Sequence, residues 1–331
     1  MRRRAFLHSC WGGIVSIKTN RLFGKAKPLR RQPDDKPDID EAVLVKVLGT
    51  AQDGGIPHIG CSCSNCQRAW KEPEFSRLIS SLAIFGLKEN KAFLVDATPD
   101  IRKQTWMIWK RIKQKNEQRK FSPDGVLLTH AHIGHYTGLM FYGYEAQSTQ
   151  ELPVYCSKRM ARFLNQNGPW DQLIKLKNIV INTIEPDHVF PLSSGIDVEA
   201  FQVPHRDEYT DTLGFKITGK QKSLLYIPDI HQWEMWERPI VDEVRKVDFA
   251  LLDGTFYSPE ELPSRDLSSI GHPFITHSVE LLRNVVATGK NQIFFTHLNH
   301  SNLALDPGGE ERRSLERQGF TLASDGMEFH L

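Results

Sequence analysis

The segment Thr129-His130-Ala131-His132-Ile133-Gly134-His135 places three histidines directly after residues 125–128, an apolar stretch that is typical of a short buried strand. The loop after a buried strand is a place where side chains from several strands converge on one point. Neutral imidazole is the commonest nitrogen ligand for zinc and related ions. The segment therefore predicts a metal site, with a polar loop that binds no metal as the alternative interpretation.

Three later residues strengthen the metal interpretation because each follows a predicted strand and carries a ligand side chain. They are His205 after strand 196–203, Asp229 after strand 223–227, and His297 after strand 293–296. Taken singly, each could be an ordinary loop residue. Together with the three clustered histidines they predict one coherent site.

The body of the chain alternates strands and helices without a fixed-period repeat or an obvious linker. This pattern predicts one α/β domain with a layered sheet core over residues 42–331. The predicted strands are 42–48, 81–85, 92–96, 125–128, 154–156, 179–184, 196–203, 213–218, 223–227, 249–253 and 293–296. The predicted helices are 101–118, 157–165, 233–245, 278–287 and 310–317.

The composition excludes several classes of protein. Among 331 residues, 42 Lys and Arg nearly balance 40 Asp and Glu, so we expect no nucleic-acid partner. No apolar run approaches the ~18 residues that a membrane-spanning helix needs. The five cysteines are too few and too clustered for a disulfide framework.

Residues 1–41 differ from the rest because basic residues dominate and acids occur only from Asp34 onward. Arg3-Arg4-Ala5-Phe6-Leu7 fits the core of a twin-arginine export signal, which predicts a periplasmic protein. The alternative is a basic arm on a cytoplasmic protein, because the apolar stretch that follows is short and no clear cleavage site is visible.

A second cluster lies in Cys61-Ser62-Cys63-Ser64-Asn65-Cys66. Three thiolates in a tight loop are soft ligands suited to one structural zinc ion, whereas unpaired or disulfide-linked thiols are the alternative. A closed tetrahedral site needs a fourth ligand. We expect His272 to provide it, with His277 or His58 as alternatives.

The pattern His-x-His-x-x-His followed by distant His, Asp and His resembles the metallo-β-lactamase superfamily, which implies an αββα sandwich. The resemblance implies that His130, His132 and His205 hold a first metal ion. It also implies that His135, Asp229 and His297 hold a second, with Asp229 bridging the two.

Gly134 departs from that pattern because the superfamily usually has Asp at this position. Glycine supplies no oxygen ligand and no charge to the second metal ion. Asp53, in the loop after the first strand, is a candidate for the missing carboxylate. Its alternative role is that of a turn residue preceding two glycines.

Several motifs resemble the pyrroloquinoline quinone biosynthesis protein B family from about residue 43 to the C-terminus. They are Leu48-Gly49-Thr50-Ala51, the cysteine cluster, Ala97-Thr98-Pro99-Asp100, Asp253-Gly254-Thr255-Phe256, Gly271-His272-Pro273 and Thr296-His297-Leu298-Asn299-His300. That branch has largely lost the first two histidines of the central motif, whereas His130 and His132 are both present here. The cysteine cluster is also similar to that of cyclic phosphodiesterases of phosphonate degradation.

The resemblance implies a metal-dependent hydrolase with one or two zinc, iron or manganese ions at the histidine site. A metal ion held by three imidazoles keeps a bound water and lowers the pKa of that water toward ~7. It would so supply hydroxide to attack a phosphodiester or an ester, lactone or amide. We expect Asp229 to orient the water and His300 to protonate the leaving group of a small-molecule or peptide-derived substrate. The alternatives are an oxidative or accessory factor in redox-cofactor biosynthesis or transport, and a binding protein without activity.

Overall fold

The computed structural model describes residues 43–113, 122–263, 266 and 270–331. The tail predicted over residues 1–41, with its export signal, lies outside the described residues, as does the end of the helix predicted over 101–118.

Within the described residues the strands form two mixed sheets of seven strands each. The first has the order β14-β1-β2-β3-β4-β5-β6, with β1 Val43–Gly49, β2 Ser81–Gly86, β3 Lys91–Val95, β4 Gly125–Leu127, β5 Leu152–Cys156, β6 Ile179–Thr183 and β14 Glu328–His330. The second has the order β13-β12-β11-β10-β9-β8-β7, with β7 His188–Ser193, β8 Ile196–Val203, β9 Thr212–Thr218, β10 Ser223–Ile227, β11 Phe249–Asp253, β12 Gln292–Thr296 and β13 Thr321–Leu322.

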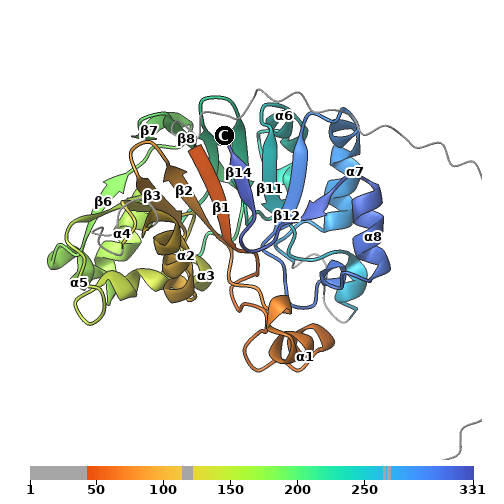
Figure 1. The fold of residues 1–331 in the computed structure, drawn as a ribbon, viewed down its shortest axis with the longest axis horizontal. Coiled ribbons are helices and arrows are strands. Elements are labelled where there is room, and N and C mark those ends of the chain that lie inside the picture. The colour runs from red at the N-terminus through yellow and green to blue at the C-terminus, as the bar shows by residue number, and fades with distance from the viewer. Residues whose placement is uncertain (1–42, 114–121, 264–265, 267–269) are drawn as a thin grey trace, which may run out of the picture. The chain divides into compact units, whose positions relative to one another are not determined.

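Helices cover the outer face of each sheet (Figure 1). The first sheet carries α2 Ile101–Lys113, α4 Lys158–Gln166 and α5 Trp170–Lys175, and the second carries α6 Ile240–Arg245, α7 Ile275–Val286 and α8 Glu310–Arg317. Short helices lie in the connections: α1 Ser64–Lys71, α3 Ile133–Tyr136, η1 Pro73–Phe75, η2 Thr137–Tyr142, η3 Trp233–Met235, η4 Pro259–Glu261 and η6 Leu303–Leu305.

The alternation of side chains along β1 shows how the layers are built. Val43, Val45 and Val47 belong to the apolar cluster between the two sheets, whereas Leu44 and Leu48 face the helices. Successive side chains of a strand point to opposite faces, so a strand that is apolar throughout must be covered on both sides. The expected αββα sandwich is thereby confirmed.

The predicted strands are all confirmed, each with its ends within two residues of the predicted ones. The helix predicted over 233–245 is wrong as a single element, because it divides into η3 and α6. Pro239 directly precedes α6, and proline is tolerated before a helix but not inside one, where it lacks the N–H that the helix needs.

The sequence also missed β7, which lies at the edge of the second sheet and contains Pro191. Proline cannot donate a hydrogen bond to a neighbouring strand and is therefore confined to such edges. Every helix within the described ranges is too short or too polar to cross a bilayer.

The direction of the strands determines where the functional loops lie. Strands β3, β4 and β5 are parallel, and β1 runs the same way because two antiparallel pairings separate it from β3. In the second sheet β10, β11 and β12 are parallel, and β8 shares their direction through β9. The loops after these strands therefore leave each sheet at its carboxyl edge.

Replacing Phe215 by alanine tests the packing between the sheets. Phe215 lies on β9 with 0% exposure, in the cluster shared by both sheets. We expect Phe215→Ala to lower the free energy of unfolding by about 3–5 kcal/mol, because it removes an aromatic ring from a close-packed core. Val189→Ala on β7, where the valine is 63% exposed, should change it by less than about 0.5 kcal/mol. Equal urea midpoints for both variants would contradict the two-sheet core.

Candidate metal centre

A first group of ligand atoms comes from the loops after β4, β8 and β10. It consists of His130, His132, His205 and Asp229, and their nearest nitrogen or oxygen atoms lie within 4.8 Å of one another. His130 Nε2 lies 3.3 Å from Asp229 Oδ2, and His205 Nε2 lies 3.2 Å from Asp229 Oδ1. His132 turns its Nδ1 inward, 3.3 Å from His205 Nε2. The sequence predicted these three histidines as partners.

A second group lies on the other side of the same carboxylate. His135 Nε2 and His297 Nε2 are 3.3 Å apart, and they lie 3.9 Å and 3.8 Å from Asp229 Oδ2. Asp53 completes this group, since its carboxylate oxygen lies 3.7 Å from His135 Nε2. Asp229 therefore lies between the two groups, where the predicted bridging role requires it.

The spacing of these atoms fits a metal ion. Two imidazole nitrogens bound to one zinc at about 2.0–2.1 Å in tetrahedral geometry lie about 3.3 Å apart. The two observed nitrogen pairs have this separation. His130 Nε2 and Asp229 Oδ1 are buried and form no properly oriented hydrogen bond within the described residues. Buried polar atoms normally have a partner, and a metal ion would be one for both atoms.

The electrostatics of the centre call for positive charge. Burial alone would raise the pKa of Asp229, but His205, His297 and His272 hold it well below its ordinary value. Burial likewise opposes charge on His135, yet Asp96, Asp53 and Asp229 raise its pKa to about 9. A buried carboxylate of this kind needs bound protons or a metal ion beside it.

Two further carboxylates orient the ligand histidines, and sequence reasoning gave them no role. Asp96 follows β3 and accepts a 2.8 Å hydrogen bond from His135 Nδ1, which leaves Nε2 facing Asp229. Asp253 ends β11 and accepts a hydrogen bond from the Thr255 hydroxyl, which lies 3.0 Å from His297 Nδ1. Such outer partners fix the tautomer and orientation of metal ligands. Both carboxylates lie at strand ends, and this position could have identified them from the sequence.

His272 belongs to the histidine centre, which corrects the prediction that it is the fourth ligand of the cysteine cluster. Its Nδ1 lies 2.9 Å from Asp253 Oδ2 and 3.3 Å from Asp229 Oδ1. Burial alone would lower the pKa of His272, but the Asp253 and Asp229 carboxylates raise it to about 9. The two contacts hold the His272 ring within the histidine centre.

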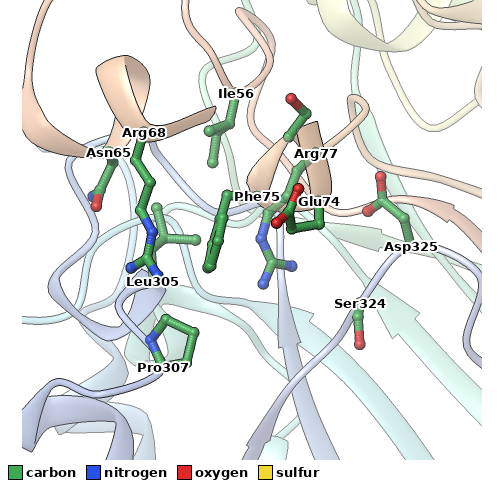
Figure 2. Close-up of a pocket in the computed structure, with 11 residues that line it drawn as sticks. Ile56, Asn65, Arg68, Glu74, Phe75, Arg77, Leu305, Pro307, Ser324 and Asp325 are labelled. Atoms are coloured by element: carbon green, nitrogen blue, oxygen red, sulfur yellow. The ribbon is translucent and has the colours of Figure 1, made fainter. Parts of the chain in front are cut away.

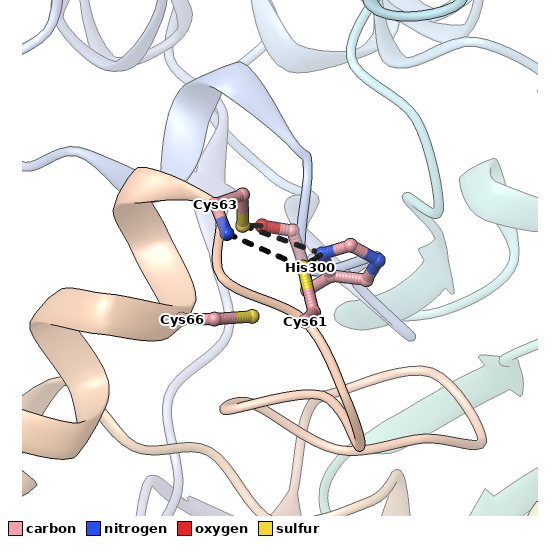
Figure 3. Close-up of side chains that lie close together, drawn as sticks. All are labelled: Cys61, Cys63, Cys66 and His300. Carbon is pink, nitrogen blue, oxygen red and sulfur yellow. Dashed lines mark hydrogen bonds between the residues drawn. The ribbon is translucent and has the colours of Figure 1, made fainter.

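His300 takes the place that was expected of His272 (Figure 3). Its Nδ1 lies 3.4 Å from Cys61 Sγ and 3.5 Å from Cys63 Sγ, and Cys66 completes the group. The prediction that His300 protonates a leaving group is therefore corrected, because this nitrogen faces the thiols. Asn65 donates a 3.0 Å hydrogen bond to the His300 carbonyl and holds the loop in place.

The cysteine cluster also has the spacing of a metal site. With Zn–S near 2.3 Å and Zn–N near 2.0–2.1 Å, a tetrahedral ion separates sulfur from nitrogen by about 3.5 Å. The distances from Cys61 and Cys63 to His300 agree with this separation. Burial raises the pKa of the Cys66 thiol to about 12, so a cation is needed to favour its thiolate.

A cavity of about 210 Å³ lies near the cysteine cluster, between α1, η1 and η6 (Figure 2). Asn65 links the two, since it lines the cavity and bonds to His300. The Arg77 guanidinium at this cavity donates to the Thr50 hydroxyl and the Ala323 carbonyl. No ligand of the histidine centre among the described residues lines this cavity.

Comparisons with known proteins agree with this architecture. A family model described as a β-lactamase superfamily domain matches residues 91–298. Coenzyme PQQ synthesis protein B of Methylobacterium sp. (strain 4-46) is 26% identical over 309 residues, covering 86% of this chain and 99% of that protein. The same protein of Bradyrhizobium diazoefficiens is 27% identical over 314 residues, covering 87% and 99%.

Two solved structures share the fold. Zn²⁺-bound PqqB from Methylobacterium extorquens superposes with a TM-score of 0.72 at 24% identity, covering 87% of this chain and 100% of that one. A diphosphatase from the PhnP family superposes with a TM-score of 0.63 at 21% identity, covering 88% and 97%. The chain belongs to the β-lactamase superfamily and resembles coenzyme PQQ synthesis protein B.

Proposed function

We propose that this protein is a metal-dependent hydrolase that cleaves a phosphodiester, or an ester, lactone or amide, in a small-molecule or peptide-derived substrate. The observation that carries the proposal is the buried Asp229 carboxylate, which contacts both groups of imidazoles. Metal ions held at such a site would activate water and polarise the bond under attack.

The residues of the chain have separate roles in this proposal. Asp229 would be a ligand to metal ions of both groups and would orient the attacking water by accepting a hydrogen bond from it. His272 moves the proton: Asp253 holds its Nδ1, which leaves Nε2 to donate to the leaving group. His132 has a partly exposed side chain, and Glu208 contacts its Nε2, so we place the substrate approach on this side.

The ligand atoms of the two clusters suit different metal sites. Three thiolates and one imidazole suit zinc in a closed structural site, which is our proposal for the cysteine cluster. Imidazoles with one bridging carboxylate suit one or two zinc, iron or manganese ions at the histidine centre. A protein of the same fold is described as Zn²⁺-bound, in agreement with zinc in at least one of the two sites.

A second candidate is an oxidative or accessory role in redox-cofactor biosynthesis. The similarity to coenzyme PQQ synthesis protein B over 86% of the chain favours it. Such a role would leave the same ligands in place but use the bound ion for electron transfer or binding. The two candidates differ in whether the loaded protein hydrolyses a substrate.

The hydrolase proposal predicts that Asp229→Asn lowers the rate of hydrolysis by about 100-fold or more, because the bridging charge is lost. The assay uses bis(4-nitrophenyl) phosphate and a panel of lactones with the zinc-, manganese- or iron-loaded protein. Asp242→Asn is the control, since Asp242 is exposed and pairs only with Arg245 on α6 among the contacts described. No turnover by the loaded wild type, together with ion-dependent oxygen consumption, would favour the oxidative candidate instead.

Asp96→Asn tests the orienting carboxylate. Asparagine has the same shape and tolerates the positive φ of 64° found at Asp96, so the fold should persist. The variant loses the charge beside His135 Nδ1, and we expect the affinity for one ion of the histidine centre to fall about 10- to 100-fold. Competition with a chelator of known affinity measures it. An unchanged affinity would contradict the role of Asp96.

His300→Ala and Cys63→Ala should each remove one zinc ion per chain, because both side chains belong to the same four-ligand group. His272→Ala should leave that ion in place. His277→Ala is a further control, since His277 is partly exposed and contacts Glu234. Metal content by mass spectrometry decides between the two histidines. Loss of the cysteine-bound zinc in His272→Ala, and not in His300→Ala, would restore the sequence-based assignment.

A further inference from the structure

Position 134 is occupied by glycine because another side chain already fills the space beside it. A Cβ atom at Gly134 would lie 2.1 Å from Asp53 Oδ1 and 2.8 Å from Asp53 Cα. Both distances are far below a normal contact, so no larger residue fits there while Asp53 keeps its place. The carboxylate of Asp53 thus lies where the side chain of residue 134 would begin.

The loop after β1 holds Asp53 firmly at this point. The Gln52 N–H donates to the Leu298 carbonyl at 2.9 Å, next to the ligand His297. The Gln52 side chain accepts a 2.6 Å hydrogen bond from Asn299, and Gly55 N–H closes a turn onto the Gln52 carbonyl. These bonds tie the loop to the segment that carries His297.

The Asp53 carboxylate is directed at the second group of ligands. Its Oδ1 accepts a 3.0 Å hydrogen bond from the Gly134 N–H and lies 3.7 Å from His135 Nε2. Asp53, His135 and His297 offer three ligand atoms within 4.8 Å of one another. A hard oxygen beside two imidazoles is a donor set for zinc, manganese or iron.

We propose that Asp53 is the oxygen ligand of the second metal position and that it replaces, from the loop after β1, the carboxylate missing at residue 134. The inference rests on the metal centre of the proposed function. The two residues then depend on each other. Gly134 has no side chain, which leaves room for the Asp53 carboxylate, and this carboxylate also reaches the second metal position.

A purely structural role for Asp53 makes a different prediction. If Asp53 only accepted the hydrogen bond from Gly134 N–H, asparagine would serve equally well, since its side-chain oxygen accepts in the same geometry. As a metal ligand, the Asp53 carboxylate also contributes a negative charge that the neutral amide oxygen of asparagine lacks, so asparagine would hold the ion more weakly. Asp53→Asn therefore separates the two roles while preserving shape.

The experiment measures metal binding to the full chain of the wild type and Asp53→Asn, by titrating the metal-free protein with Zn²⁺ and counting ions by mass spectrometry. We expect three ions in the wild type, one at the cysteine cluster and two at the histidine centre. In Asp53→Asn we expect one histidine-centre ion to bind at least about 10-fold more weakly, with the melting temperature of the metal-free protein unchanged. Asp248→Asn is the matched control, since Asp248 also accepts a backbone hydrogen bond, from Ser223 N–H, outside these metal groups.

A second variant tests the same arrangement from the other side. Gly134→Ala leaves the Asp53 carboxylate intact but displaces it, so it should weaken the same ion. Two histidine-centre ions bound with wild-type affinity in Asp53→Asn would overturn the proposal for Asp53 and leave the hydrolase proposal standing. A wild type that binds no ion beyond the one removed by Cys63→Ala would overturn both.

Discussion

The buried carboxylate of Asp229 is the constraint on which the rest of the centre depends. It is 1% exposed and lies between His130 and His205 on one side and His135 and His297 on the other. An isolated charge in the interior is costly, so the surrounding imidazoles must bring positive charge to it. The ligands follow strands of both sheets. The two sheets must therefore pack with their carboxyl edges side by side for these side chains to meet. The packing of the two sheets is therefore needed both to bring the ligand side chains together and to place positive charge beside Asp229.

The sequence alone predicted the features that depend on strand ends. His130, His205, Asp229 and His297 each follow a buried strand, and strands with the same direction deliver such residues to one edge. The same reasoning extends to Asp96, which follows β3, and to Asp253, which ends β11. Apolar periodicity also sufficed for every predicted strand, because both sheets are covered on both faces.

Features that depend on how loops fold were not predictable in this way. His272 and His300 were assigned to each other's sites because spacing shows a residue type but not the direction of its side chain. His297 has a φ of 59°, a conformation that turns the chain sharply after β12, so that His297 faces Asp229 while His300 faces the thiols. Asp53 is different, because the sequence already offered it as a candidate for the carboxylate missing at residue 134. Only its close fit against Gly134, a contact between residues distant in sequence, needed the structure.

We expect Asp229 to lie between two metal ions. Crystals of the wild-type protein grown without chelator, with anomalous diffraction recorded at the absorption edge of each bound metal, test it directly. We expect one peak among Cys61, Cys63, Cys66 and His300, and two peaks about 3.5–4 Å apart with Asp229 between them. A map with the cysteine-bound peak alone, or with ions that do not contact Asp229, would contradict it.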